Sequence, residues 1–551
     1  MLPDRAAVVV VGGGPAGLAV ALELGRRGVE VVVVEPRLEV SLDRPRAKTT
    51  SVRTMEHLRR WGLADRLREL APLPVAWSNE AVFATSLLGR EITRFSDCFG
   101  LASQRCDEFA EAGQQVPQPL VELVLRQAVA RQPTVTLATG NEVTAVDEAD
   151  EHVRVETIDP LGATHVTVAR YVLGCDGSNS LTRRAIGSFY EGSTDSRTNF
   201  NMVFRAPGLA EKVPHGAAIH YWVLDPAVPG LVGRMDLADT WWAMAMGVDA
   251  EAGNADPTRL VRTLIGSGTA TSADEIEIEI MSTDPWTARM LNAHTYGTRR
   301  VFLVGDAAHL NPPWGGHGFN TAVGDAVNIG WKLAAVVQGW ADETLLRSYE
   351  EERKPVAQQT IDLASANMAQ LSTNFADPLL NAPGPDGDSA RAETASRIQV
   401  AKNGEFHSLG LVLGYDYRRS SIVVADGTPE PNIDPAIFTP TARPGARLPH
   451  RWLPDGRSIY DVLGSGFTLL LTDPHADAAP FVVAAGKRGI PLAVVDLGAL
   501  GCAPADLAAA FEAAMVLVRP DQHVAWRTPT TCVDASTAAQ VLGCAIGAAR
   551  G

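Results

Sequence analysis

The feature that most constrains the fold is a glycine-rich turn between two apolar segments near the N-terminus. Residues 6–11 form a continuous apolar run, which is typical of a strand buried on both faces. Gly12, Gly14 and Gly17 follow in G-x-G-x-x-G spacing, and residues 18–24 continue as an apolar helix. Glycines at this spacing allow a tight turn, close approach of the backbone to a pyrophosphate, and close packing of helix on strand. The segment therefore predicts a dinucleotide site with its phosphates at the helix N-terminus.

A carboxylate at the end of the next apolar run supports this prediction. Residues 29–34 lead into Glu35, which follows Gly17 at the distance of about 20 residues usual for such sites. The carboxylate can accept hydrogen bonds from ribose hydroxyls and would repel a 2′-phosphate. The rival interpretation of this apolar N-terminus is a secretory signal. Because a basic start is lacking and Asp4 precedes the apolar run, we expect a cytoplasmic protein instead.

A second glycine-rich loop lies far along the chain. An apolar run at residues 300–304 precedes Gly305–Asn320, which reads as a strand end followed by a glycine loop that opens a helix. Nearly the whole first half of the chain separates the two glycine-rich segments, which suggests one extended ligand held at two ends. A diphosphate at the first end and a ring at the second have the shape of FAD.

Composition limits the partners of the chain. Its 551 residues exceed one ordinary domain, and 46% of them are hydrophobic, enough for large cores. The net charge of -16 and an isoelectric point of about 5.3 argue against nucleic acid or an anionic membrane as partner. No other run is long and apolar enough to span a bilayer. Six cysteines without a C-x-x-C pair argue against a zinc site or a dithiol centre.

The pattern of apolar runs predicts an α/β fold with an inserted sheet. Residues 1–185 and 290–372 read as strands alternating with helices, and we expect them to form one discontinuous FAD-binding domain. Residues 186–289 contain short alternating runs, which predict an antiparallel sheet that binds substrate. Part of residues 72–105 is expected to join that sheet.

The last third of the chain predicts a separate domain. Prolines and glycines crowd residues 375–388, so we expect a surface linker at 373–395. Residues 396–551 are predicted to form a second α/β domain. Its buried strands are expected at 467–472, 491–495 and 515–518.

Three segments together carry a resemblance to a known family. They are Gly12–Gly17, Cys175–Ser180 followed by Arg183, and Gly305–Asn320. As a set they resemble the signatures of class A flavoprotein aromatic hydroxylases, which share the para-hydroxybenzoate hydroxylase-like fold.

Other segments resemble one branch of this family. Residues 44–47 and 53–56 are similar to the segment that follows the first acidic residue, and residues 444–450 and 519–527 resemble the longer branch with a thioredoxin-like tail. That branch includes phenol and 2,4-dichlorophenol hydroxylases and polyketide-tailoring hydroxylases.

The resemblance implies both a fold and a chemistry. The implied fold is a Rossmann-like FAD-binding domain with an interleaved antiparallel-sheet substrate domain, plus a C-terminal thioredoxin-like domain. NAD(P)H would reduce FAD, O2 would add at flavin C4a, and the hydroperoxide would pass oxygen to an electron-rich phenolate carbon. We therefore expect a monooxygenase that hydroxylates a phenolic or hydroxypyridine-like small molecule, in natural-product tailoring or chlorophenol-type degradation.

The resemblance and the physical reading of each motif give a set of FAD-binding residues. Asp306 can accept a hydrogen bond from a ribityl hydroxyl, with a helix cap as the alternative. The amides of Phe319 and Asn320 can hold negative charge that develops on the flavin. Asp176 is expected near the pyrophosphate and Gln118 near the sugar, with an ordinary turn and a helix surface as their alternatives. The full set is Gly12, Gly14, Pro15, Ala16, Gly17, Glu35, Arg37, Arg46, Ala47, Gln118, Val143, Asp176, Gly305, Asp306, Pro313, Gly316, Gly318, Phe319 and Asn320.

Substrate contacts are predicted on the second loop and on the middle sheet. Pro313 and Trp314 would form a wall beside the reacting edge of the flavin. Residues of the sheet would face this wall, although tryptophans in a sheet more often belong to the core. The predicted substrate residues are Tyr221, Trp222, Arg234, Met235 and Trp314.

The chain departs from the family at the residues that would activate a phenol. Where phenol hydroxylase-like proteins carry an acid, this chain has Lys48 beside Arg46. Cations there can stabilise a phenolate without acting as a base, or can line the flavin entrance or a solvated loop. His317 replaces a commoner glutamine or leucine, and is either a proton relay or a neutral packing residue. Together with Pro313, these residues form the predicted catalytic set.

Two other functions stay open at this stage. The same cofactor motifs serve Baeyer–Villiger or epoxidising oxygen insertion on a polyketide, and a flavoprotein that binds an aromatic ligand without turnover would also carry them. A flavin halogenase is disfavoured because the W-x-W-x-I-P motif is absent. Cys502, Cys532 and Cys544 are too dispersed for a thioredoxin dithiol, so the tail is expected to act in packing or in a homodimer.

Overall fold

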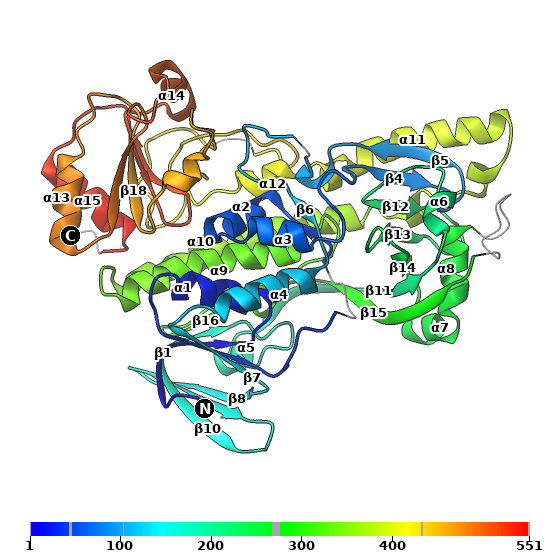
Figure 1. Ribbon diagram of the computed structural model, residues 1–551, viewed down its shortest axis with the longest axis horizontal. Helices are drawn as coiled ribbons and strands as arrows, with labels where there is room; N and C mark the ends of the chain where they lie inside the picture. Colours follow the sequence, from blue (N-terminus) through cyan, green and yellow to red (C-terminus); the bar gives the residue numbers. More distant parts are fainter. Residues whose placement is uncertain (1, 43–46, 103, 267–275, 431–432, 549–551) are drawn as a thin grey trace.

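The computed structural model describes residues 2–42, 47–102, 104–266, 276–430 and 433–548, which form a mixed α/β protein (Figure 1). The first sheet has the strand order β7-β2-β1-β10-β9-β8, and β16 also pairs with β10. Strands β7, β2, β1, β10 and β16 are parallel, so their carboxyl ends meet at one edge. These strands are β1 (Arg5–Val11), β2 (Val31–Glu35), β7 (Val135–Thr139), β8 (Glu142–Glu148), β9 (Val153–Ile158), β10 (Thr164–Gly174) and β16 (Val301–Leu303).

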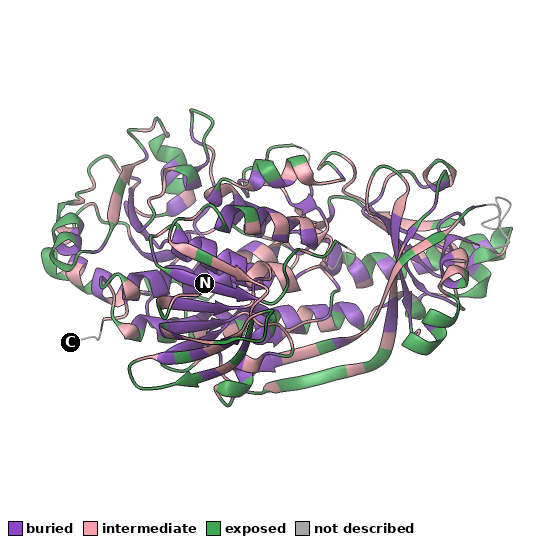
Figure 2. Ribbon diagram, turned by 60° about the horizontal axis from the view of Figure 1, so that its bottom comes forward, coloured by how far each residue is buried: buried purple, intermediate pink, exposed green. Residues whose placement is uncertain are grey.

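Two buried helices follow the two glycine-rich loops. Helix α1 (Pro15–Gly25) begins directly after the first loop, and α9 (Gly318–Val337) begins within the second. Pro15 stands in the first turn of α1, where the missing N–H leaves no helical hydrogen bond unmade. The two helices pack on one another, and Figure 2 shows buried residues concentrated in this central layer.

The second sheet is assembled from segments that are far apart in the sequence. Its order is β17-β15-β11-β14-β13-β12-β4-β5, and its neighbouring strands are antiparallel except for β12 and β4. The two longest strands, β11 and β15, extend from the second sheet towards the first (Figure 1). The strands are β4 (Ala81–Ala84), β5 (Glu91–Phe95), β11 (Tyr190–Arg205), β12 (His220–Val223), β13 (Gly230–Arg234), β14 (Thr240–Met246), β15 (Glu279–Ala293) and β17 (His309–Leu310).

Residues 373–395 differ from the surface linker that their prolines and glycines predicted. Helix α11 (Pro385–Phe406) occupies part of this segment and crosses position 396, where the C-terminal domain was expected to begin. Pro385 lies in the first helical turn, a position that tolerates proline, whereas the prediction treated it as a breaker. Ile398 and Phe406 are buried in the apolar cluster of the second sheet. The segment therefore covers that sheet (Figure 1).

The C-terminal unit contains a smaller sheet with the order β19-β18-β20-β21. Three of its strands lie where the sequence predicted them, and the fourth, β21, was not predicted. Strand β19 is half-buried rather than buried. The elements are β18 (Phe467–Leu471), β19 (Leu492–Asp496), β20 (Met515–Val518), β21 (Val524–Thr528), α13 (Ala479–Arg488), α14 (Pro504–Phe511) and α15 (Ala535–Ala545).

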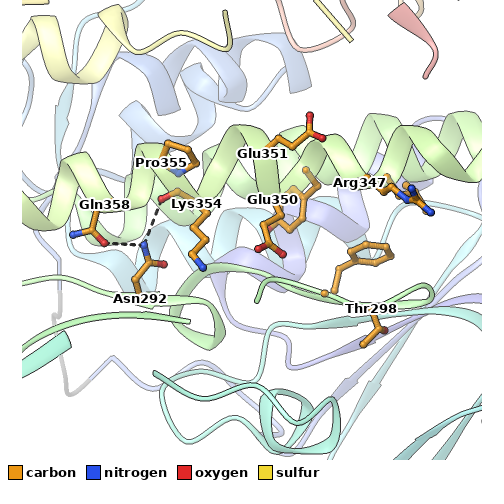
Figure 3. Close-up of a pocket in the computed structure, with 12 residues that line it drawn as sticks. Asn292, Thr298, Arg347, Glu350, Glu351, Lys354, Pro355 and Gln358 are labelled. Atoms are coloured by element: carbon orange, nitrogen blue, oxygen red, sulfur yellow. Dashed lines mark hydrogen bonds between the residues drawn. The ribbon is translucent and has the colours of Figure 1, made fainter. Parts of the chain in front are cut away.

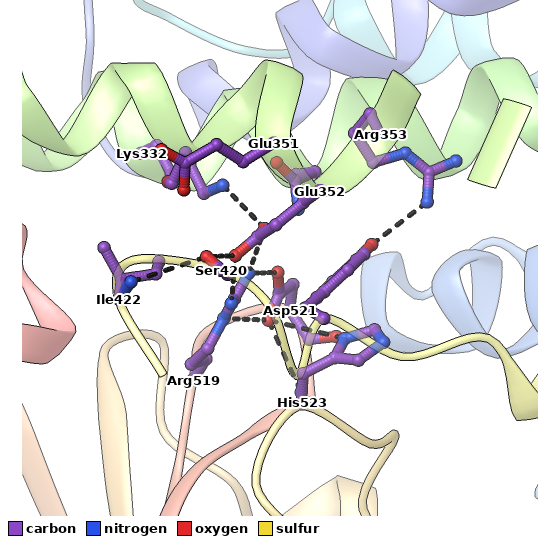
Figure 4. A network of polar contacts seen from close by, with 12 residues as sticks. Lys332, Glu351, Glu352, Arg353, Ser420, Ile422, Arg519, Asp521 and His523 are labelled. Atoms are coloured by element: carbon purple, nitrogen blue, oxygen red, sulfur yellow. Dashed lines mark hydrogen bonds and ion pairs between the residues drawn. The ribbon is translucent and has the colours of Figure 1, made fainter. Parts of the chain in front are cut away.

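Buried charges join the C-terminal unit to the helices of the first sheet (Figure 4). Arg519 donates to the Glu352 carboxylate at 2.6 and 2.8 Å, and both side chains are fully buried. Glu352 lies on α10 (Ser348–Met368) and also accepts a hydrogen bond from Lys332 of α9 at 2.6 Å. Asp521 accepts from Arg519 and, at 3.0 Å, from the indole of Trp331. The network fixes how the C-terminal unit packs on α9 and α10.

Candidate active site

Residues of both glycine-rich loops line one cavity. Its volume is about 1190 Å³, and residues of the first loop, such as Gly14, and of the second, such as Gly316, line it together. Further lining comes from the carboxyl ends of β2 and β10, the start of α4, one face of the second sheet and the end of α11, among other segments. An elongated ligand can therefore contact both loops at once.

The first loop leaves open space beside its middle glycine. A Cβ on Gly17 would lie 1.9 Å from the carbonyl oxygen of Gly12, so that position admits only glycine. At Gly14, by contrast, nothing lies within 4 Å of the place a Cβ would take. Gly14 directly precedes α1, whose first amides carry the positive end of the helix dipole. The space therefore fits a pyrophosphate held by the backbone.

Glu35 anchors the first loop and lines the cavity. Its Oε2 accepts a hydrogen bond from the Gly13 N–H at 2.7 Å. Its Oε1 accepts from Nε of Arg37 at 2.7 Å, and Arg37 also donates to Glu122 at 2.8 Å. A carboxylate offers about four acceptor positions, so Glu35 has capacity left for a ribose hydroxyl. Gln118, one turn before Glu122 on α4 (Gln118–Val129), also lines the cavity.

Asp176 lines the cavity, but its carboxylate is used locally. It accepts hydrogen bonds from Ser180 Oγ at 2.6 Å and from the Thr182 N–H at 2.9 Å, and so fixes the start of α5 (Leu181–Ala185). The predicted cofactor residues in the cavity lining are Gly12, Gly14, Pro15, Ala16, Glu35, Arg37, Ala47, Gln118, Val143, Asp176, Asp306, Pro313, Gly316, Gly318 and Phe319. Those outside the lining are Gly17, Gly305 and Asn320, while Arg46 lies outside the described residues.

Asn320 and His317 belong to the end of the second loop, where α9 begins. Asn320 Nδ2 donates to the carbonyls of Gly316 and Thr49 at 2.7 and 3.2 Å, and its Oδ1 accepts from the Ser51 N–H at 2.9 Å. These bonds tie the loop to β3 (Thr49–Thr50). His317 is buried, and its Nε2 has no hydrogen-bond partner among the described residues. Burial lowers the pKa of His317 to about 4, so the ring is neutral at pH 7, and the residue lines the cavity.

A buried aspartate behind the second loop was not predicted. Asp325 Oδ2 contacts Nε2 of His309 at 2.7 Å and accepts from the Gly305 N–H at 3.2 Å, while its Oδ1 accepts from Nε of Arg353 at 2.7 Å. Burial acts to raise the pKa of Asp325, but Arg353 and His309 outweigh it and hold the pKa below its usual value. An acid inside the largely apolar run 318–337 was a signal that could have identified this position.

One row of residues across the second sheet supplies a wall of the cavity. In the strand register, Asp284 pairs with Asn201, Asn201 with Met244, Met244 with Leu231, and Leu231 with Trp222. All five residues line the cavity. Directly paired residues share one face of a sheet, so the row runs from a polar end at Asp284 to an aromatic end at Trp222.

Lys48 lies over this wall. Its Nζ is 4.2 Å from the ring centroid of Trp242, which also lines the cavity. Burial lowers the pKa of Lys48 to about 8, and the negative charge of Asp284 opposes this shift. Lys48 directly precedes β3, which Asn320 holds against the second loop. The cation thus lies between that loop and the wall of the second sheet.

Only some of the predicted substrate residues face the cavity, because neighbouring residues on a strand point to opposite faces of the sheet. Trp222 and Trp314 line the cavity. Tyr221 belongs to the core on the other face of the sheet and donates its hydroxyl to a backbone carbonyl. Arg234 donates to two carbonyls of the adjoining turn at 3.0 and 2.6 Å, and neither it nor Met235 is in the lining. Neighbours on a strand point to opposite faces, so Tyr221 and Trp222 could not both contact one ligand.

The end of α11 brings two charges that were not predicted at the site. Glu405 lines the cavity, and Lys402, one turn earlier, lies with its Nζ 4.1 Å from the ring centroid of Trp222. The two side chains form an ion pair. The sequence analysis missed them because it assigned residues 396 onwards to a separate C-terminal domain.

A second cavity of about 610 Å³ lies between α10 and the strands β15 and β16 (Figure 3). None of the predicted site residues lines it. Asn292 there donates to the Lys354 carbonyl and to Gln358 Oε1 at 3.4 and 3.1 Å. Because most of the predicted site residues line the other cavity, the cavity between the two loops is the candidate site.

Across the described ranges, no cluster of three potential metal ligands occurs, and no helix is long and apolar enough to cross a membrane.

Known proteins are similar to this chain in sequence and in fold. Residues 5–364 match the FAD binding domain family, and residues 441–549 match the aromatic-ring hydroxylase C-terminal family. The chain is 32% identical to 2,4-dichlorophenol 6-monooxygenase of Delftia acidovorans, over 94% of each chain. These matches confirm the family resemblance predicted from the three sequence segments.

Two solved structures are similar over essentially the whole length. The rebeccamycin biosynthetic enzyme RebC with reduced flavin has 33% identity and a TM-score of 0.88, and the match covers 100% of both chains. The ternary complex of aklavinone-11 hydroxylase with FAD and aklavinone has 28% identity and a TM-score of 0.83, over 99% of this chain and 100% of the other.

Proposed function

The chain belongs to the FAD-dependent aromatic-ring hydroxylases, and we propose that it hydroxylates a phenolic ring of a flat, multi-ring substrate. It is a flavin monooxygenase, a class that typically takes its electrons from NAD(P)H. The observation that carries the proposal is the position of Lys48, with its Nζ 4.2 Å from the Trp242 ring and its backbone next to the strand that Asn320 ties to the second loop.

The residues of the two loops fit FAD. The open side of Gly14 and the first amides of α1 suit the diphosphate, and Glu35 suits a ribose hydroxyl. The first turn of α9, with Gly318 and Phe319, suits negative charge on the ring. When bound, FAD supplies the activation of O2 and the transfer of one oxygen atom to the substrate. The chain has to hold the cofactor, orient the substrate ring and exclude water.

Lys48 and Asp284 are proposed to act on the substrate hydroxyl. With a pKa of about 8, Lys48 is mostly charged at neutral pH and stabilises a phenolate oxygen. Asp284 lines the same cavity and can accept the phenol proton. The acid that phenol hydroxylase-like proteins carry in the Lys48 loop is thus supplied here by β15.

Aromatic side chains suit the task of holding a flat ring away from water. Trp222, Trp242, Trp286 and Trp314 line the cavity, and the last two pack edge-to-face with centroids 5.6 Å apart. Indole rings offer large apolar faces with little freedom to rearrange. This wall supports a substrate of more than one ring.

The strand topology supports a finer description of the fold. Parallel order β2-β1-β10 with α1 after β1 supports a Rossmann-like FAD-binding domain. The order β19-β18-β20-β21, with helices α13 and α15 alongside, supports a thioredoxin-like C-terminal domain. Its cysteines, Cys502, Cys532 and Cys544, are free thiols, so we assign this domain a packing role.

The proposal is tested with FAD-loaded protein, NADPH and a panel of naphthols and hydroxyanthraquinones. Some of these phenols should stimulate NADPH oxidation and gain one oxygen atom at a ring carbon ortho or para to the hydroxyl, where a phenolate is electron-rich. Mass spectrometry and NMR identify the product. A ring-expanded lactone would indicate Baeyer–Villiger insertion instead. Binding without any oxygenated product across the panel would contradict the proposal.

A further inference from the structure

Glu405 lines the cavity and forms a buried ion pair with Lys402, and the proposed chemistry uses neither charge. Lys402 is 0% exposed and Glu405 3% exposed. Burying two charges carries a desolvation penalty, and apolar residues of similar volume often fill such a position with no loss of stability. The presence of the charges therefore needs another explanation.

Both charges of the pair come from one helix. Lys402 and Glu405 lie on α11, three positions apart; Lys402 contacts the Asn367 carbonyl of α10 at 3.5 Å and the Trp222 ring, and Glu405 contacts the Gly315 backbone. Glu352, in contrast, pairs with two segments other than its own. Ion pairs between separate elements thus account for Glu352, whereas no charge from another element pairs with Glu405 among the ion pairs of the described residues.

The carboxylate of Glu405 has capacity for a further hydrogen bond. Lys402 and the backbone of Gly315 contact it, whereas a carboxylate offers about four acceptor positions. Burial raises the pKa of Glu405, so an additional donor would stabilise its charged form. Contact with Gly315 also puts the carboxylate beside the second loop, where the substrate ring is proposed to lie.

We propose that Glu405 is a specificity-determining residue that accepts a hydrogen bond from a hydroxyl or ring N–H of the aromatic substrate. This donor is distinct from the hydroxyl at Lys48, and the inference rests on the proposed function. Lys48 lies over Trp242, whereas Lys402 lies over Trp222. The ring of His220 is edge-on to both tryptophans, at 6.4 and 6.1 Å between centroids. The two lysines thus lie over different tryptophans of one cavity, and the proposed substrate engages Lys48 with one hydroxyl and Glu405 with a second donor.

Two bicyclic phenols test this inference on the FAD-loaded protein. In 2,6-dihydroxynaphthalene the hydroxyls are equivalent, so either can take the Lys48 position while the other reaches Glu405. The monomethyl ether, 6-methoxy-2-naphthol, lacks the second donor. Dissociation constants come from the change in flavin absorbance on binding. Because a hydrogen bond to a charged group is worth on the order of tenfold to hundredfold in affinity, the unaltered protein should prefer the diol by about tenfold or more.

Variants on α11 separate recognition from folding. Glu405→Gln should reduce the preference to about threefold or less, with the affinity for the methyl ether changed by less than about twofold. The double variant Lys402→Met with Glu405→Met leaves no unpaired charge and should abolish the preference. Glu393→Gln is the same substitution at an exposed site on this helix and should keep it.

The outcomes distinguish this inference from the proposed function. An undiminished preference in the double variant, or no preference in the unaltered protein, overturns the role of Glu405. Hydroxylation of either phenol would in that case leave the proposed function intact. If neither phenol binds, the two-point recognition by Lys48 and Glu405 is overturned, and the full panel of phenols decides the proposed function separately.

Discussion

Two regions of the molecule bury charge in different ways. At the junction of α9, α10 and the C-terminal unit, Glu352 pairs with Lys332 and Arg519, so that each charge comes from a different element. At the cavity, Lys402 and Glu405 pair within one helix, and Glu405 borders a space of about 1190 Å³. The difference indicates that buried charge stabilises packing in the first region and recognises a ligand in the second.

Removing a charge at the junction should have the largest effect on stability. Arg519→Met leaves the Glu352 carboxylate buried with one cation fewer, which should lower the free energy of unfolding by about 3–5 kcal/mol. Arg299→Met removes an exposed arginine paired with Glu343 and should cost about 0–1 kcal/mol. Urea unfolding followed by tryptophan fluorescence measures both. If both variants lose a similarly small free energy of unfolding, the buried charges at the junction do not stabilise packing.

Filling the open side of the first loop should abolish cofactor binding without unfolding the protein. Gly14 has φ −74, so Gly14→Val is compatible with the backbone, but its side chain would occupy the pyrophosphate space. We expect the affinity for FAD to fall by more than about 100-fold. Gly486→Val, at an open position of α13, should retain FAD. Flavin absorbance of the purified variants gives the answer, and full FAD content in Gly14→Val would refute the assignment of the loop.

Loss of the carboxylate beside that loop should have a smaller effect. Glu35→Ala removes the acceptor of the Gly13 N–H and of a ribose hydroxyl, and should weaken FAD binding by about 1.5–3 kcal/mol. Turnover at saturating FAD should change little. Glu39→Ala, at an exposed position four residues on, is the matched control. Titration of the apoprotein with FAD measures both, and equal affinities would mean that Glu35 does not bind the cofactor.

The smallest effect is expected in the C-terminal unit. Converting Cys502, Cys532 and Cys544 together to alanine should leave specific activity within about twofold, because these thiols are dispersed and free. A large loss of activity with unchanged circular dichroism would show that this unit does more than pack.

The end of the cavity at the first loop could be predicted from the sequence, whereas the end at the substrate wall largely could not. The first loop is local: a strand, three glycines and a helix follow one another within residues 5–25, and backbone geometry dictates their arrangement. Glu35 ends the next strand and therefore lies beside the same loop. The three strands of the C-terminal unit were similarly recognisable as short apolar runs.

The substrate wall was much less predictable because it is built from separate segments. The alternation of side chains along a strand predicts that Tyr221 and Trp222 face opposite sides of β12. The sequence does not indicate which of the two sides faces the ligand. Asp284 reaches Asn201 only through the pairing of β15 with β11. Glu405 was missed because Pro385 was taken for part of a linker, although a proline there can begin a helix.

If the charges in the cavity act on the substrate, they should govern the ratio of product formed to NADPH consumed. With a pKa of about 8, Lys48 is charged below pH 8 and neutral above it, so this ratio should fall in the unaltered protein as pH rises through about 8. Lys48→Arg keeps its charge and should remove the fall, whereas Lys48→Met should give a low ratio at every pH. The ratio is measured between about pH 6 and 9. An equal and constant ratio in all three proteins would show that the charge of Lys48 does not act on the substrate.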